Sequence, residues 1–175
     1  TGSSAELSSR GTPILILMRH GSRDLTGLDR LTAEGREQAM RLTRDVQEKR
    51  LPRPTRLIAT PRKRSQETLR FLADDLLFKI EIDPNCDERQ PGETVPEFES
   101  RVRQWIQSTR LREAAPADVT LVVSHLDWLE TAVIFLESDE SELGNQNRGH
   151  RPRAAFIFIK TDFGEGERND SKRMG

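Results

Sequence analysis

Cysteine, long hydrophobic runs and net charge are all scarce in this sequence. Cys86 is the single cysteine, so an intramolecular disulfide is excluded, and we expect a packing residue in a protein of a reducing compartment, the cytoplasm. No apolar run approaches the ~18 residues that cross a bilayer. The 28 Lys and Arg residues nearly balance the 29 Asp and Glu residues. This balance argues against a general nucleic-acid or membrane surface and leaves room for a local basic pocket.

The length of 175 residues predicts one folded domain with looser segments at both ends. Residues 1–11 are rich in Ser and Gly and show no basic-then-apolar signal pattern, so we expect a flexible arm. Residues 163–175 are polar and contain glycines, and we expect them to form a flexible tail. The folded domain is therefore predicted over residues 12–162.

Short apolar segments alternate along the chain with patterns typical of helices. We predict strands at the five apolar segments, which are residues 13–18, 56–59, 80–82, 118–123 and 154–160. This alternation is typical of βαβ units on a parallel sheet. Two of the segments contain continuous apolar runs, as strands covered on both faces do. The sequence therefore predicts an α/β fold, a three-layer sandwich with a mostly parallel central sheet and helices on both faces.

Two helices are predicted between the first three strands. The first covers residues 31–50, with Thr32 as its N-cap and apolar residues at helical spacing. The second covers residues 61–78, with Pro61 in its first turn, where proline is favoured. We expect both helices to bury one apolar face against the sheet.

Two more helices are predicted in the second half of the chain. One begins at the capping-box pattern of Thr94 to Glu97, and the other covers residues 126–136. The polar segment 138–153 contains two glycines and is predicted to be a loop, with His150 as a surface residue.

Basic and imidazole side chains follow three of the predicted strands. Arg19-His20-Gly21 follows the first, Thr60-Pro61 and the basic residues 62–64 follow the second, and Ser124-His125 follows the fourth. Because the carboxyl ends of parallel strands lie at one edge of a sheet, we expect these groups to meet. Two imidazoles, several cations and two helix N-termini at one point are suited to a dianionic phosphoryl group.

Taken singly, these residues also fit simpler roles. A histidine after a strand, such as His125, is commonly a partly buried hydrogen-bonding residue, and residues 62–64 fit a solvated helix face. Two histidines are compatible with a metal ion, but no Asp, Glu or Cys stands at ligand spacing from either, so no metal site is predicted. The joint placement of the groups, rather than any one of them, favours the anion site.

Four motifs, in this order, resemble those of the histidine phosphatase superfamily, which has the phosphoglycerate-mutase-like fold. They are Arg19-His20-Gly21, Leu31-Thr32-Ala33-Glu34-Gly35 with Gln38-Ala39, Thr60-Pro61 through Arg64 to Thr68, and Ser124-His125. The resemblance extends from about Leu15 to Phe158, nearly the whole folded region.

The resemblance implies a phosphoryl transfer in two steps that needs no metal and no other cofactor. His20 attacks the phosphorus to form a phosphohistidine, and water then releases phosphate. Arg19, Arg64 and His125 hold the phosphoryl oxygens, on which the transition state places its charge. Arg62 stands where the family usually has a leucine or a similar residue, and it either widens the basic rim toward an acidic partner or is simply exposed. Substrate contacts are expected from four residues: Gly21, Ser22, Arg62 and Leu126.

Two departures from the common family pattern resemble the small phosphohistidine phosphatases. Leu126 follows His125 where many members have glycine, and the connection from Gly21 to Leu31 is short. Little room remains for insertions that enclose small substrates. The resemblance therefore implies an open site for a phosphorylated substrate such as a phosphoprotein. No nucleic-acid or membrane partner is expected, and the oligomeric state is left open.

A phosphoester substrate also requires a proton donor for its leaving group. The family position after the third strand corresponds to Glu88, and Glu93 is a weaker candidate; both also fit loop carboxylates. With Glu88 as the acid, the alternative function is a small-molecule phosphomonoesterase. A non-catalytic phosphate-binding module is the alternative outside enzymes.

Overall fold

The computed structural model describes residues 13–108, 118–146 and 155–159. Its strands form one parallel sheet in the order β3-β2-β4-β1-β5. The strands are β1 (Ile14–Arg19), β2 (Arg56–Ala59), β3 (Ile80–Ile82), β4 (Val119–Ser124) and β5 (Ala155–Ile159). β4 is the central strand, and all its residues are buried, as its uninterrupted apolar run predicts.

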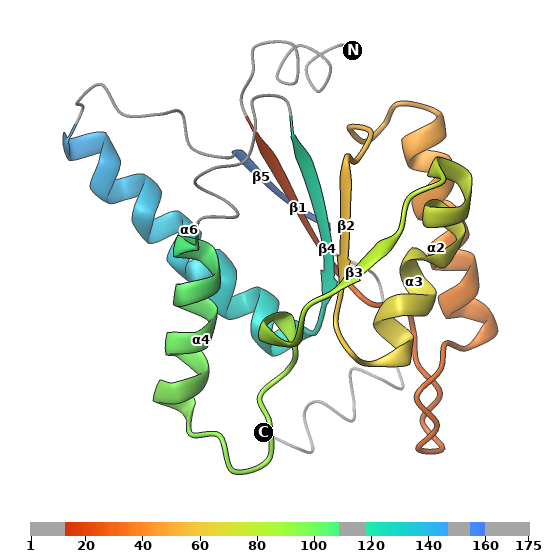
Figure 1. Cartoon of the computed structure of the whole chain (residues 1–175), viewed down its shortest axis with the longest axis horizontal. Helices are drawn as coiled ribbons and strands as arrows, with labels where there is room; N and C mark the ends of the chain where they lie inside the picture. Colours follow the sequence, from red (N-terminus) through yellow and green to blue (C-terminus); the bar gives the residue numbers. More distant parts are fainter. Residues whose placement is uncertain (1–12, 109–117, 147–154, 160–175) are drawn as a thin grey trace.

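Helices cover both faces of the sheet, which gives three layers (Figure 1). α2 (Ala33–Gln47) and α3 (Lys63–Leu76) pack on one face, whereas α4 (Val95–Gln107) and α6 (Leu126–Gln146) pack on the other. Successive residues of β1 point to opposite faces, so Ile16 joins the core beneath α2 and α3, and Leu17 joins the core beneath α4 and α6. The predicted three-layer α/β fold is confirmed.

Two predicted helix starts are confirmed by their caps. The side chain of Thr32 accepts the amide N–H of Gly35 at 3.1 Å, and α2 begins directly after Thr32. Thr94 and Glu97 form a reciprocal capping box at the start of α4, with both hydrogen bonds at 3.2 Å.

α3 begins two residues later than predicted. Arg62 has an extended backbone and is the N-cap, but its side chain makes no capping hydrogen bond. The carboxylate of Asp29, in the loop after β1, instead accepts the amide N–H groups of Lys63 and Arg64. The cap comes from a distant part of the chain, so the local pattern around Pro61 does not reveal where the helix begins.

The prediction of a loop over residues 138–153 is wrong for its first part, because α6 continues to Gln146. The added segment contains no proline. Extending an existing helix is much less costly than starting one, so polar residues and Gly144 are accepted there, the glycine at a cost of about 1 kcal/mol.

Other predictions concern the ends of the chain and the cysteine. The arm of residues 1–11, the tail of residues 163–175 and His150 lie outside the described residues. Cys86 is buried in the core beneath α4 and α6, where it packs as predicted. Among the helices of the described ranges, none is both long enough and apolar enough to cross a membrane.

Candidate active site

The ends of β1 and β4 place two imidazoles side by side. Arg19 pairs with Ser124 in the parallel register, and the amide of His20 donates to the Ser124 carbonyl at 3.0 Å. His20 and His125 are therefore neighbours, with ring centroids 5.3 Å apart and ring planes tilted by 57°. The end of β2 joins them through Thr60, whose hydroxyl contacts His125. The three strand ends thus meet, as expected for a parallel sheet.

His20 is buried, and its tautomer is fixed by a backbone group. Nδ1 lies 2.7 Å from the carbonyl oxygen of Gly21. A carbonyl can only accept, so Nδ1 carries the proton and the lone pair of the neutral ring is on Nε2. Burial lowers the pKa of His20 well below its usual value, 6.5; the Gly21 carbonyl opposes this, and the charges of His125, Arg64 and Arg19 lower it further. The ring is therefore neutral near pH 7 and suited to nucleophilic attack.

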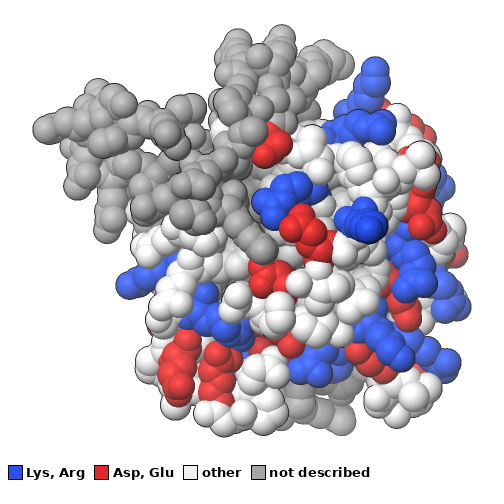
Figure 2. Space-filling view, in the orientation of Figure 1, with Lys and Arg blue, Asp and Glu red and all other residues white. Residues whose placement is uncertain are grey.

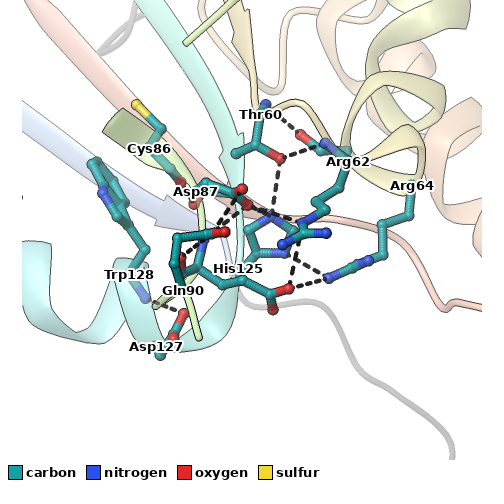
Figure 3. A network of polar contacts seen from close by, with 12 residues as sticks. Thr60, Arg62, Arg64, Cys86, Asp87, Gln90, His125, Asp127 and Trp128 are labelled. Atoms are coloured by element: carbon teal, nitrogen blue, oxygen red, sulfur yellow. Dashed lines mark hydrogen bonds and ion pairs between the residues drawn. The ribbon is translucent and has the colours of Figure 1, made fainter. Parts of the chain in front are cut away.

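His125 lies among three polar side chains (Figure 3). Its Nε2 is 2.9 Å from Thr60 Oγ1 and 3.2 Å from Asp87 Oδ1, and its Nδ1 is 3.4 Å from Arg64 Nη2. Because a carboxylate only accepts, Nε2 is the nitrogen of His125 that can donate to Asp87. Burial acts to raise the pKa of Asp87, but the His125 hydrogen bond and the Arg62 charge outweigh it, so the pKa is lowered. Asp87 is an ionised partner of His125 that the sequence motifs did not indicate.

Arg64 is the buried cation of the site and is 6% exposed. Its Nη1 lies 3.0 Å from Asp29 Oδ1, and its Nη2 lies 3.2 Å from Glu88 Oε1. Its Nε has no hydrogen-bond partner within the described part of the chain. An unsatisfied buried donor is costly, so this guanidinium has an unused capacity to bind an anion.

Asp29 is a second acidic residue that the motifs did not indicate. Its carboxylate accepts the amide N–H groups of Lys63, at 2.6 Å, and Arg64, at 3.3 Å, besides the Arg64 guanidinium. Burial acts to raise the pKa of Asp29, but these hydrogen bonds outweigh it and lower the pKa below its usual value. Asp29 therefore caps α3 and orients Arg64. Aspartate is a common cap, yet 34 positions separate Asp29 from Lys63, so no local pattern identifies it.

Hydroxyl side chains of α3 connect the three strand ends. Thr68 Oγ1 accepts the amide N–H of Gly21 at 2.9 Å and donates to a carbonyl of its own helix at 2.7 Å. Ser65 Oγ accepts the amide N–H of Thr60 at 3.0 Å and donates to the carbonyl of Val123 at 2.7 Å. The turn after β1 and the ends of β2 and β4 are thereby fixed to one helix.

The turn after β1 packs closely against α2 through two glycines. A Cβ on Gly21 would lie 2.8 Å from the carbonyl oxygen of Gly35, and a Cβ on Gly35 would collide with the carbonyl oxygen of Ser22. The amide of Ser22 donates to Gln38 Oε1 of α2 at 2.7 Å. The absent side chain of Gly21, which the sequence predicts as a substrate contact, allows close approach of the α2 backbone.

Glu88 follows the short 3-10 helix η1 (Pro84–Cys86) and reaches the site. Its Oε1 lies 3.2 Å from Arg64 Nη2 and 3.5 Å from Arg62 Nε. Arg62 Nε also lies 3.4 Å from Asp87 Oδ1. The two neighbouring carboxylates therefore share the guanidinium of Arg62, as Figure 3 shows for Asp87.

Glu93 is held away from the reacting groups by Arg101. Both Glu93 carboxylate oxygens accept from the Arg101 guanidinium, at 2.9 and 3.0 Å. The same guanidinium donates to the carbonyls of Asn85, Asp87 and Glu88. The hydrogen bond from Arg101 lowers the pKa of Glu93. Glu93 and Arg101 thus order the loop that carries Glu88, and the geometry favours Glu88 as the carboxylate near the reaction.

The other predicted residues lie at the ends of the same elements. Arg19 ends β1, and its charge contributes to the lowered pKa of His20. Leu126 begins α6 and is 37% exposed. Over the described surface that Figure 2 shows, basic and acidic side chains are interspersed, in keeping with the balanced charge of the sequence.

Solved structures of a hydrolase and of phosphatases share this fold at low sequence identity. A mycobacterial hydrolase is 15% identical with a TM-score of 0.56, and the match covers 69% of this chain and 78% of that one. A mycobacterial glucosyl-3-phosphoglycerate phosphatase complexed with VO3 is 16% identical, with a TM-score of 0.52 and the same coverage. A phosphoserine phosphatase mutant from Entamoeba histolytica, in complex with phosphoserine, is 15% identical with a TM-score of 0.55, over 81% of this chain and 88% of that one.

A parallel sheet that brings a neutral histidine, a second histidine and a buried arginine to one edge forms an arrangement suited to binding a phosphoryl group. Residues 15–92 match the family model described as histidine phosphatase superfamily, branch 1. No curated protein matches the chain by sequence. The chain is therefore similar to the histidine phosphatase superfamily over residues 15–92, and solved structures that share its fold include phosphatases.

Proposed function

We propose that the chain transfers a phosphoryl group from its substrate to His20 and then to water. Nε2 of the neutral His20 ring attacks the phosphorus, and the bond to the leaving group breaks with its electrons on that group. The hydrogen bond from Nδ1 to the Gly21 carbonyl stabilises the ring as it gains positive charge. Water then attacks the phosphohistidine, the phosphorus–nitrogen bond breaks, and phosphate leaves with the neutral ring restored.

The buried Arg64 guanidinium beside two imidazoles is the observation that carries this proposal. The transferred group spreads its charge over three oxygens, and fixed cations stabilise that charge most effectively where water is excluded. Arg64, Arg19 and His125 supply the cations and donors. Because these residues neutralise the charge, the scheme requires no metal ion.

A phosphohistidine, or another phosphate displayed on a protein, is the substrate class that we favour. The connection between β1 and α2 is a short hairpin, closed by the bridge between Arg23 and Leu31, and it projects beyond the sheet in Figure 1. Leu25 and Leu28 of this hairpin are both more than half exposed. Exposed leucines beside a site are suited to contact with a protein surface.

A small phosphomonoester is the second candidate, favoured by the position of Glu88. Its Oε1 lies 3.2 Å from the guanidinium of Arg64, close to where a leaving group would depart. A carboxylic acid there would supply the proton that an alkoxide leaving group requires. Two proteins of similar fold are named phosphoserine phosphatase and glucosyl-3-phosphoglycerate phosphatase, which supports testing monoesters.

The first test is hydrolysis of an aryl phosphate in the presence of EDTA by the parent chain and by His20→Ala. We expect the parent to turn over and the variant to lose at least about a thousandfold in kcat, because the nucleophile is removed. Rapid quenching into alkali should also yield a phosphorylated parent chain, with the phosphate on His20 by mass spectrometry.

His20→Asn is the matched control for structure, because its amide can still donate to the Gly21 carbonyl. We expect it to fold as the parent does and to be equally inactive. Turnover that survives in either variant contradicts the assignment of His20 as nucleophile. Loss of parental activity in EDTA that a divalent metal restores contradicts the metal-independent scheme.

A further inference from the structure

We propose that Arg101 is a positioning residue for His125, on which it acts through the backbone that carries Asp87. The inference rests on the proposed function, in which His125 binds the transferred phosphoryl group. It adds a side chain of α4 to the groups on which the binding of that phosphoryl group depends.

The four carbonyl groups of residues 85–88 all accept hydrogen bonds from side chains. Arg101 donates to three of them, at 2.8, 2.9 and 3.1 Å, and these are the carbonyls of Asn85, Asp87 and Glu88. Ser124 Oγ, at the end of β4, donates to the fourth, the carbonyl of Cys86. Because backbone polar groups need partners when they are buried, these donors fix the segment that carries the Asp87 side chain.

The guanidinium of Arg101 has all five of its N–H groups in use. Besides the three carbonyls, it binds both carboxylate oxygens of Glu93, at 2.9 and 3.0 Å. Its central carbon lies 5.1 Å from the centroid of the buried Phe98 ring, so the ring covers one face of the guanidinium. A lysine carries the same charge but has three donors in a different geometry. Only arginine can therefore hold this segment and Glu93 together.

The fixed backbone places the Asp87 carboxylate against His125. Asp87 Oδ1 lies 3.2 Å from Nε2 of His125, and the side-chain amide of Gln90 donates to Asp87 Oδ2 at 3.0 Å (Figure 3). Asp87 and His125 are both buried, so water competes little for their contact. When the carbonyl of Asp87 loses its donor, the carboxylate and the imidazole that it contacts lose their fixed place. A misplacement of about 1 Å at a reacting group can cost on the order of a hundredfold in rate.

The test is a double-mutant cycle of Arg101→Lys and Asp87→Ala, measured as kcat/KM for p-nitrophenyl phosphate. We expect Arg101→Lys to lose at least about tenfold, because the charge remains and the geometry of the five bonds does not. In the Asp87→Ala background the same change should cost less than about twofold, because the contact through which Arg101 acts is already absent. Arg103→Lys, an exposed position of the same helix, is the matched control and should keep the parental value.

Two further measurements do not depend on turnover. The Kd for inorganic phosphate, by isothermal titration calorimetry, should increase in Arg101→Lys and stay unchanged in Arg103→Lys. In ¹H–¹⁵N NMR spectra, the Nε2 signal of His125 should shift in Arg101→Lys, because its hydrogen bond to Asp87 is altered. Urea unfolding reports any loss of stability separately, and a merely structural role would lower stability without moving that signal.

Three results would each overturn the inference. They are parental kcat/KM in Arg101→Lys, a loss that stays tenfold in the Asp87→Ala background, and an unchanged His125 signal. Where Arg101→Lys does not fold, Glu93→Gln, which weakens the hold on the same guanidinium, is read by the same criteria. A parent that does not hydrolyse the aryl phosphate overturns the proposed function instead, and the NMR comparison then still decides whether Arg101 positions His125.

Discussion

The reactivity of His20 depends on the backbone and the charges around it. The Gly21 carbonyl accepts from Nδ1 and so leaves the lone pair on Nε2. Burial, with three nearby positive or ionisable groups, disfavours a second proton on the ring. The ring is thereby held neutral, as the proposed nucleophilic role requires, although arginines lie near it.

The lowered pKa of His20 predicts a pH-dependent stability. Unfolded His20 titrates near 6.5 and folded His20 well below that value. Between the two values the unfolded chain binds more protons, so the free energy of unfolding rises with pH. This contribution is fully present above pH 6.5 and is lost as the pH falls, by up to ~1.4 kcal/mol per pH unit.

Urea unfolding of the parent and of His20→Asn between pH 5 and pH 8 checks this prediction. The variant lacks the imidazole, so its stability should fall less than that of the parent as the pH is lowered from 7 to 5. If the free energy of unfolding changed equally with pH in the two proteins, the lowered pKa of His20 would be contradicted.

The site residues that the sequence predicts lie in short local motifs, whereas those it does not predict depend on contacts between distant segments. His20 and Arg64 follow strands or open a helix within short motifs, so adjacent residues indicate them. Asp29 and Asp87 belong to the site through contacts with residues that are distant in the sequence and become neighbours only on folding. The amide of Lys63, which donates to Asp29, is 34 positions away. Aspartates are common in turns, so nothing local separates these two from Asp24.

Among the elements, α3 carries most of the connections that assemble the site. Its first turn supplies Arg64, its hydroxyl groups hold three strand ends, and its cap is the Asp29 carboxylate. Because α3 is capped by a residue outside the helix, the sequence predicts its start two residues too early. The extension of α6 to Gln146 was missed for another reason, since polar composition alone does not end a helix.

Asp29→Ala should weaken both α3 and phosphate binding. The variant loses the acceptor for two amide N–H groups, so we expect a decrease of about 1–2 kcal/mol in the free energy of unfolding. It also frees Arg64 to adopt other orientations, so the Kd for inorganic phosphate should increase. Urea unfolding and isothermal titration calorimetry measure the two effects.

Two variants serve as controls for Asp29→Ala. Asp29→Asn keeps an oxygen that can accept from the helix, so its loss of stability should be smaller. Asp24→Ala removes a carboxylate of the same hairpin that bonds Thr26 and Arg30 instead, and it should leave phosphate binding unchanged. A stability of Asp29→Ala equal to that of the parent would exclude the capping role.

For the whole molecule, the order of the strands predicts the order of local stability. β1 and β4 each have a hydrogen-bonded strand on both sides, whereas β3 has one neighbour and is half-exposed or exposed throughout. Amides of β1 and β4 should therefore exchange with deuterium only on global unfolding, and those of β3 should exchange faster. Hydrogen-exchange mass spectrometry checks this, and equal protection of β3 and β4 would contradict it.

The separation of the two imidazoles follows the spacing of two neighbouring strands. His20 and His125 follow adjacent strands in register, and their 5.3 Å centroid distance is close to the ~4.8 Å between neighbouring strands. Laboratory evolution is therefore free to vary the exposed end of the hairpin around Leu25 and Leu28, whereas Asp29, which holds Arg64, and Asp87, which contacts His125, have to be kept. The distance between the two histidines would stay constant in such variants. Libraries that vary this exposed segment could therefore be screened for new substrates while the residues of the site are kept.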